Sequence, residues 1–502
     1  MTFTHASLWQ KAHPFPSFPT LESDIDCEVL IVGAGITGLL TAYELRKIGL
    51  QVVVIDSHEI ASGTTGRTTA KITAQHGLIY HSLIESSGID QAQEYYETAI
   101  MGKNALLQTA ADLQMNIALE HKDSVIYTTE EMNVQKIVDE FHAYERLHIP
   151  GSYTDNIDFP IETKAAITML DQSEFDPLSY LLHIVEDLVD DGVTFYEHTQ
   201  AVDLEQDEKI YVHTHRDHKI TSTYVVQASH FPFYDPLGMF TTRLIPERSF
   251  VYTGKNHSLE VKDMYISCDQ PLRSFRSTTV NNEDYFLIAG EGYIVGKDND
   301  HTRPYEALTS TANTLFPNHT FVSQWSAQDY NTMDSIPYIG RLKNKNENIF
   351  VATGFKKWGM TTSATAALLI ADLIQKRPNP HEEMYAPSRF DVSTTIPSFL
   401  KQNTHVASQL VKGKVSSDSK DVEDLKKHEA TTVFKRGKKL GIYKDQDEQI
   451  HVIDTTCTHL GCEVEWNPHD YTWDCPCHGS RYMYNGTVIE GPAKKSLQND
   501  EL

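Results

Sequence analysis

Four cysteines and two histidines that could bind a metal lie close together near the C-terminus. They are Cys457, His459, Cys462, Cys475, Cys477 and His478. A Cys-x-His pair and a Cys-x-x-His pair stand with fifteen residues between them. Structural zinc sites usually pair cysteine with cysteine and histidine with histidine, whereas each pair here is mixed. Mixed pairs favour a [2Fe–2S] cluster in which two histidines replace two cysteines, with zinc as the alternative. The first chemistry that the sequence predicts is therefore the transfer of single electrons.

The spacing of the two pairs resembles that of the Rieske [2Fe–2S] family. This resemblance implies that Cys457 and Cys475 bind one iron and that His459 and His478 bind the other. We therefore expect a Rieske cluster in the last eighty residues.

Four further residues near the predicted cluster have roles that the same resemblance implies. Cys462 and Cys477 stand where the family closes a disulfide between the two cluster loops. Ser480 and Tyr482 stand where its high-potential members place hydroxyl donors to the cluster sulfurs, although loop packing would also explain them. Such donors stabilise the reduced cluster and raise its potential, so we expect a value in the upper half of the Rieske range of roughly −150 to +300 mV.

A glycine-rich loop near the N-terminus follows a short apolar strand. Residues 27–31 read CEVLI, and Gly33, Gly35 and Gly38 open a helical pattern that leads to a second strand ending at Asp56. In a dinucleotide-binding unit these glycines allow a tight turn, the approach of the pyrophosphate, and close packing of helix on strand. The pyrophosphate lies at the helix N-terminus, and the acid holds the ribose hydroxyls. The loop therefore predicts a dinucleotide site.

Residues 61–71 indicate that the dinucleotide is FAD. They resemble the second glycine-rich segment of the glycine oxidase and D-amino-acid oxidase/dehydrogenase family, which passes under the flavin. The resemblance implies contacts from Gly63, Arg67, Thr68 and Lys71. It extends over about residues 25–375 and includes the segments 334–340 and 349–361, which in the family close the FAD site. The remaining cofactor contacts that it implies are Val202, Gly340, Gly354, Gly359 and Thr361.

These motifs predict an α/β FAD-binding domain of the glutathione-reductase-like Rossmann type, an α+β substrate domain and a small all-β Rieske domain. We expect an N-terminal extension (1–24), an oxidoreductase (25–375), a linker with a helical piece (376–421) and the Rieske domain (422–502). Within the oxidoreductase, the FAD-binding parts cover about 25–90, 192–230 and 325–375. The substrate part covers about 91–191 and 231–324.

Composition excludes several classes of partner. A net charge of −26 over 502 residues argues against nucleic acid and against an anionic membrane surface. No apolar run is long enough to span a membrane, and the sequence begins with neither a signal peptide nor a twin-arginine signal. We therefore expect a cytoplasmic protein. Cys27 and Cys268 are expected to be buried thiols.

Two further patterns have competing interpretations. His76 and His81 form the H-x4-H spacing that helps bind a mononuclear iron in Rieske oxygenases. Because His76 directly follows the flavin segment, a place in the flavin pocket or the core is favoured. Gly290, Gly292 and Gly296 follow a strand, but no helix start follows them, so we expect a loop of the substrate sheet and no NAD(P)H site.

Catalytic residues are not fixed by any motif. The candidates are His76, His230, Arg276 and Trp358, with Arg243, Tyr252, Arg273 and Lys357 as further substrate contacts. For each of the substrate contacts a packing or solvated role is the alternative.

The whole chain resembles a flavoprotein that oxidises an amine or amino acid, fused to a Rieske domain. We expect a dehydrogenase in which the substrate reduces FAD, the cluster takes electrons singly, and a redox protein or quinone accepts them. Three alternatives stay open: a reductase component for a separate oxygenase, a flavin oxidase with a regulatory cluster, and a non-enzymatic electron-transfer or assembly partner. The sequence names neither the substrate nor the acceptor.

Overall fold

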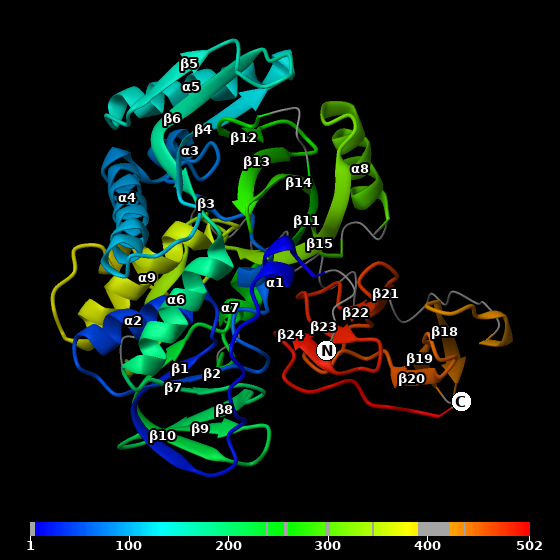
Figure 1. The fold of residues 1–502 in the computed structure, drawn as a ribbon. Helices are drawn as coiled ribbons and strands as arrows, with labels where there is room; N and C mark the ends of the chain where they lie inside the picture. Colours follow the sequence, from blue (N-terminus) through cyan, green and yellow to red (C-terminus); the bar gives the residue numbers. More distant parts are fainter. Residues whose placement is uncertain are drawn as a thin grey trace.

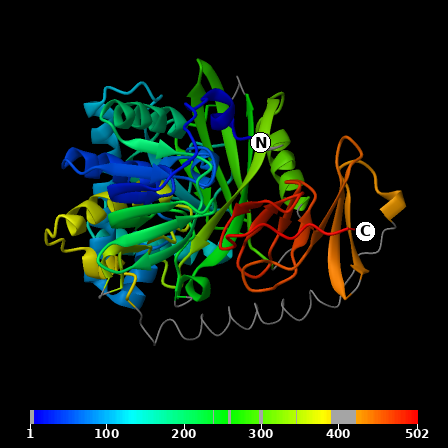
Figure 2. The ribbon, with the colours of Figure 1, turned by 90° about the horizontal axis from the view of Figure 1, so that it is seen from below.

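The computed structural model describes residues 6–236, 239–255, 260–296, 302–343, 346–389, 422–435 and 437–501. Figures 1 and 2 show two large sheets with helices packed against them and two small C-terminal sheets at one side. The helical piece predicted in the linker lies outside the described residues. Among the described helices, none is long and apolar enough to cross a membrane.

The first sheet has the predicted dinucleotide-binding arrangement. Its four central strands, β10, β1, β2 and β7, are parallel, and β17 continues the parallel run. The strands along the sheet are β16 (Tyr338–Lys343), β17 (Asn346–Thr353), β10 (Lys219–Gln227), β1 (Ile25–Val32), β2 (Val52–Ile55) and β7 (Thr194–Tyr196). Strand β9 (Ile210–Thr214) pairs with β10, and β8 (Ala201–Gln206) pairs with β9. Four consecutive buried residues end β1 and four form β2, as expected for strands covered on both faces.

The second sheet, called the substrate sheet below, is built mainly from the residues predicted for the substrate part. It contains β15 (Thr320–Asn331), β11 (Ile245–Lys255), β14 (Glu283–Ile294), β13 (Arg273–Val280), β12 (Met264–Ser267), β4 (Glu120–Thr128), β6 (Ala165–Glu174) and β3 (Lys71–Ile72), with β5 (Gly151–Thr154) beside β6. One prediction is wrong here. The segment from Gly290 onward is not a loop, because β14 continues through Ile294 and stays paired with β11, whereas its pairing with β13 ends at Gly290.

Helices cover both sheets. They are α1 (Leu8–Ala12), α2 (Ile36–Lys47), α3 (Tyr80–Ser87), α4 (Ile89–Asp112), α5 (Val134–Arg146), α6 (Pro177–Asp190), α7 (Met239–Arg243), α8 (Arg303–Leu315), α9 (Gly359–Ile374) and α10 (Glu382–Tyr385). The start of α6 follows its sequence signal, because Pro177 is its first residue and the Asp176 side chain accepts from the backbone amides of Leu178 and Ser179. Helices α2 and α9 pack together beneath the glycine-rich loop, and their buried faces join the largest core.

The N-terminal extension is part of the oxidoreductase fold. In α1, Trp9 is fully buried and its indole nitrogen donates to the carbonyl of Thr68 at 2.7 Å. Ser7 donates to the carbonyl of Gly66 at 2.5 Å. The extension therefore holds the second glycine-rich segment in place.

The C-terminal part consists of two small antiparallel sheets. The outer one contains β18 (Ala430–Lys435), β19 (Lys438–Lys444) and β20 (Ile450–Asp454); the inner one contains β21 (Glu465–Asn467), β22 (Thr472–Asp474), β23 (Arg481–Met483) and β24 (Val488–Glu490). In both views the inner sheet lies against the oxidoreductase part and the outer sheet points away.

Candidate functional site

Two loops of the C-terminal part bring the predicted cluster ligands together. The loop after β20 carries Cys457, and the loop after β22 carries Cys475; both are buried free thiols. The predicted disulfide between Cys462 and Cys477 is present and joins the two loops. Sγ of Cys475 lies within 4.8 Å of both disulfide sulfurs, but an oxidised pair offers no thiolate to a metal.

The histidines complete a donor set that fits a Rieske cluster. The rings of His459 and His478 lie 5.0 Å apart, and Nδ1 of each is buried without a hydrogen-bond partner among the described residues. Burial lowers the pKa of both histidines to about 4, which leaves neutral imidazoles. A hydrogen bond from Cys475 lowers the pKa of the Cys457 thiol to about 6. Neutral imidazole and thiolate are the forms that bind metals.

The predicted hydroxyl donors lie beside these ligands. Tyr482 is fully buried, and its Oη lies 3.1 Å from Sγ of Cys457. Ser480 is also fully buried, and its Oγ accepts from the backbone amide of Ala493 at 3.0 Å, which leaves its proton available for another acceptor.

A cavity of about 740 Å³ lies at the carboxyl ends of the parallel strands, the position where open α/β sheets bind their ligands. Gly33 has a positive φ of 111°, and a Cβ there would overlap the backbone of Ala228. A Cβ on Gly38 would overlap the carbonyl of Gly33. Asp56 reaches into the loop, and its carboxylate accepts from the amides of Ala34 at 2.7 Å and His58 at 2.8 Å. The glycines therefore have the close contacts that a dinucleotide loop requires.

The cavity separates the sequence-predicted residues into two groups. Eight of the predicted FAD contacts line it: Gly33, Gly35, Asp56, Gly63, Arg67, Thr68, Lys71 and Gly359. Those that stand outside the lining are Gly38, Val202, Gly340, Gly354 and Thr361. Of the catalytic and substrate candidates, His76, His230, Trp358 and Lys357 line the cavity, whereas Arg243, Tyr252, Arg273 and Arg276 do not.

His76 lies in the cavity wall as a neutral imidazole, and both of its ring nitrogens have hydrogen-bond partners. Its Nδ1 lies 2.7 Å from the hydroxyl of Tyr95, its Nε2 lies 3.0 Å from that of Thr361, and its ring stacks on Trp358 at 5.0 Å. Burial lowers the pKa of His76 to about 3. His81 instead donates its backbone amide to Glu140. His76 therefore lies in the wall of the cavity, whereas His81 is half-buried and stands outside the cavity lining.

Lys71 and Arg276 have different roles although both are buried. Lys71 lines the cavity, and burial together with Arg276 lowers its pKa to about 7. Arg276 forms an ion pair with Glu174 and donates to the backbone carbonyls of Thr69 and Ala70. Arg276 thus fixes the backbone just before Lys71 without reaching the cavity itself.

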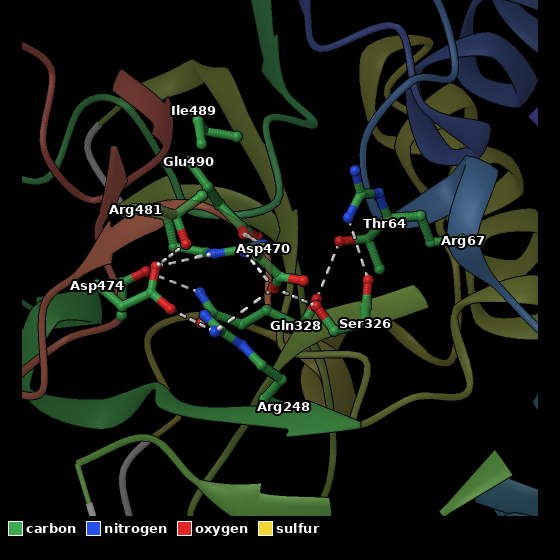
Figure 3. Close-up of polar contacts among 12 residues, drawn as sticks. Thr64, Arg67, Arg248, Ser326, Gln328, Asp470, Asp474, Arg481, Ile489 and Glu490 are labelled. Carbon is green, nitrogen blue, oxygen red and sulfur yellow. Dashed lines mark hydrogen bonds and ion pairs between the residues drawn. The ribbon is translucent and has the colours of Figure 1, made fainter. Parts of the chain in front are cut away.

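The inner C-terminal sheet docks on the substrate sheet through buried charges that the sequence analysis did not anticipate (Figure 3). Arg248 of β11 is 1% exposed and forms an ion pair with Asp474, which directly precedes the predicted ligand Cys475. Arg481 of β23 binds Asp470 at 2.7 Å and Asp474 at 3.3 Å. Burial raises the pKa of Asp470, but Arg481 and Arg248 outweigh burial and lower it to about 2.

His230 makes a second ionic link between the parts. It stands at a φ of 64° after β10, with Nε2 3.0 Å from Asp329 and Nδ1 3.0 Å from Glu490 of β24. Burial lowers the pKa of His230, but the two carboxylates outweigh burial and raise it to about 10. His230 is therefore an imidazolium at neutral pH, at once a cavity wall residue and a docking residue. A charged residue beside a short apolar strand, as in PERSFVYT and TWDC, was the available sequence signal for this interface.

Comparisons with known proteins agree with the division of the chain into an oxidoreductase part and a C-terminal Rieske part. A family model described as FAD dependent oxidoreductase matches residues 28–373, and one described as Rieske [2Fe-2S] domain matches residues 404–500. A Bacillus subtilis (strain 168) protein named as the Rieske 2Fe-2S iron-sulfur protein YhfW is 40% identical over 494 residues, which are 98% of this chain and 97% of that protein. Gamma-glutamylputrescine oxidoreductase of Escherichia coli (strain K12) is 23% identical over 391 residues, 72% of this chain and 87% of that protein. The structure of glycine oxidase from Geobacillus kaustophilus matches 73% of this chain and 99% of its own with a TM-score of 0.62 and 18% identity.

Proposed function

Because this chain belongs to the family of FAD-dependent oxidoreductases and carries a C-terminal Rieske [2Fe–2S] domain, we propose that it is a dehydrogenase for an amine or amino-acid-like substrate. Its electrons would pass singly from FAD to the Rieske cluster and on to an external redox protein or quinone. When bound, FAD takes two electrons from a substrate, and a [2Fe–2S] cluster takes one.

One buried side chain carries this proposal, because it touches both the cavity and a cluster loop. Gln328 of β15 lines the cavity, and its backbone carbonyl accepts from Oγ1 of Thr64 at 2.9 Å. Its Nε2 donates to the carbonyl of Gly479 at 2.8 Å, and Gly479 directly follows the predicted ligand His478. A short bonded route thus runs from the second glycine-rich segment to the cluster loop; Figure 3 shows its first two residues, Thr64 and Gln328.

The cluster loop packs closely against the oxidoreductase part at two glycines. A Cβ on Gly479 would lie 2.7 Å from Cβ of Pro246, and one on Gly296 would overlap the carbonyl of Pro476. His478 is only 7% exposed. This packing supports electron transfer between the parts over a fixed short distance.

The other end of the cavity supports a substrate with both an amine and an anionic group. Lys71, Lys136 and Lys356 line it together with apolar residues such as Ile126 and Leu272. Cations at the wall would attract a carboxylate. With its pKa near 7, Lys71 is neutral often enough to accept a proton from a substrate ammonium group.

An anaerobic screen of amines and amino acids tests the proposal, with the flavin followed by absorbance and the cluster by EPR. A compound that bleaches the flavin and then raises the signal of the reduced cluster supports it. Bleaching without any cluster signal, or reduction of the cluster only by a separate reductant protein, contradicts it.

A matched pair of variants on one strand tests the route. Gln328→Leu keeps the size of the side chain but removes its bond to Gly479, so the EPR signal should lag further behind flavin bleaching. Gln324→Leu changes the same strand where it faces α8 and should leave the lag unchanged. Equal lags in both variants would remove Gln328 from the route.

A further inference from the structure

The segment Val488–Lys494 of the Rieske part crosses the nucleotide end of the cavity. All seven of its residues line the cavity. At one end, the carbonyl of Ile489 lies 2.9 Å from Nε2 of His58, which follows β2. At the other end, Nζ of Lys494 donates to the carbonyl of Val202 in β8 at 2.7 Å.

Two contacts fix the middle of the segment. Glu490 binds His230, and the carbonyl of Gly491 accepts from the hydroxyl of Tyr330 at 2.9 Å. Tyr330 is fully buried and stands outside the cavity lining. The segment is therefore held at both ends and in its centre by the oxidoreductase part.

The end of the cavity that this segment covers is the end where the adenosine half of FAD belongs. Gly33 and Gly35 mark the pyrophosphate position at the start of α2, and Asp56 marks the ribose position. Residues 199–201 continue the same wall beyond Asp56. A nucleotide lying along these strand ends would have the oxidoreductase sheet on one side and segment 488–494 on the other.

We propose that the Rieske domain forms part of the FAD site, with segment 488–494 closing the cavity over the adenosine half of the cofactor. FAD is then retained by two domains, and its release requires this segment to move away. The inference rests on the FAD of this family occupying the cavity, and is independent of the substrate and of the direction of electron flow.

The rate of FAD release from the full-length protein tests the proposal, measured as flavin fluorescence after dilution. Lys494→Met removes the bond to Val202, and Tyr330→Phe removes the bond to Gly491 without changing any Rieske residue. Each should release FAD about three- to tenfold faster, as expected for the loss of one hydrogen bond that holds the segment. Lys495→Met is the matched control, because this neighbouring lysine is exposed and lies outside the cavity lining.

Two further measurements, EPR of the cluster and hydrogen exchange of the segment, complete the test. EPR of the reduced cluster in each variant shows whether the Rieske domain is intact, and Tyr330→Phe decides the question if Lys494→Met loses its cluster. Hydrogen exchange should show the amides of 488–494 becoming faster when FAD is removed, since coupling between two binding events is reciprocal. The proposal would be overturned if the parent protein and all variants released FAD at the same rate, or if none of them released FAD measurably. This outcome would count against it even if an amine substrate is found.

Discussion

Replacing Arg248 by methionine should loosen the Rieske domain from the oxidoreductase part. The guanidinium is 1% exposed and binds Asp474 across the interface, with Asp470 at 3.9 Å and the side-chain oxygen of Gln328 at 3.2 Å. Methionine fills similar space but leaves the buried Asp474 carboxylate with one cation fewer. Removing one partner of a buried pair is costly because the other charge stays out of water.

The size of the effect follows from what remains around Asp474. Breaking a buried ion pair typically costs about 3–5 kcal/mol. Because Arg481 still binds Asp474 at 3.3 Å, we expect the lower end, about 3 kcal/mol. With a urea dependence of about 1–3 kcal/mol per M, the urea midpoint for loss of the cluster signal should fall by roughly 1–3 M. Circular dichroism of the cluster measures this midpoint while flavin fluorescence follows the other part.

Two comparisons separate docking from general damage. Arg46→Met removes an arginine that also binds two acids, Asp187 and Asp191, but both lie within the oxidoreductase part; it should leave the cluster midpoint unchanged. Adding Asp474→Asn to Arg248→Met should recover part of the loss, because no unpaired charge then remains. A cluster midpoint in Arg248→Met equal to that of the parent protein, or strictly additive losses in the double variant, would refute the reasoning.

Three other outcomes follow from the site. Tyr482→Phe removes the donor to Cys457 and should lower the midpoint potential of the cluster by about 40 mV, the equivalent of a bond worth ~1 kcal/mol; an unchanged potential in a redox titration would mean that the hydroxyl does not favour the reduced state. Cys457→Ser should abolish the EPR signal and keep the flavin absorbance, whereas a retained signal would exclude Cys457 as a ligand. Because the pKa of His230 is raised to about 10 by its partners, its ionic link to Glu490 stabilises docking fully below pH 6.5 and is lost as pH rises towards 10. The urea midpoint for loss of the cluster signal should be lower at pH 10 than at pH 6.5 in the parent protein, and this difference should be smaller in His230→Gln. The same decrease in both proteins would contradict this assignment.

The parts of the site that the sequence predicts are those encoded in short segments. The glycine-rich loop needs only Gly33, Gly35 and Gly38 at fixed spacing between a strand and a helix, and the structure places all three as that spacing requires. The Cys462–Cys477 disulfide was implied by the resemblance of the cluster motif to the Rieske family, and it is present. Such patterns can be interpreted without knowing the tertiary fold, because the chemistry depends on neighbours in the sequence.

The rest depends on contacts between distant residues. Arg276 was a reasonable substrate contact by residue type, yet its partners are Glu174 and the backbone at residues 69–70, about a hundred and two hundred positions away. Nothing in the local sequence of β13 specifies them. The contacts of segment 488–494 with His58 and Val202 likewise arise only when the Rieske part docks on the oxidoreductase part.

Docking through buried charge also changes how the fusion of the two domains should be understood. A tether alone raises the effective concentration of an attached domain to about the millimolar range, and contact would then be intermittent. Here the interface itself fixes the position of the cluster loop, because separation would expose Arg248 and Asp474 as unpaired charges or require water to replace their bonds. The distance from the cavity to the cluster is then set by β11 and β15, which carry Arg248 and Gln328, and not by the residues that link the domains. The substrate sheet thus contacts both sites: residues of these two strands line the cavity, and Arg248 and Gln328 hold the part of the chain that carries the predicted cluster ligands.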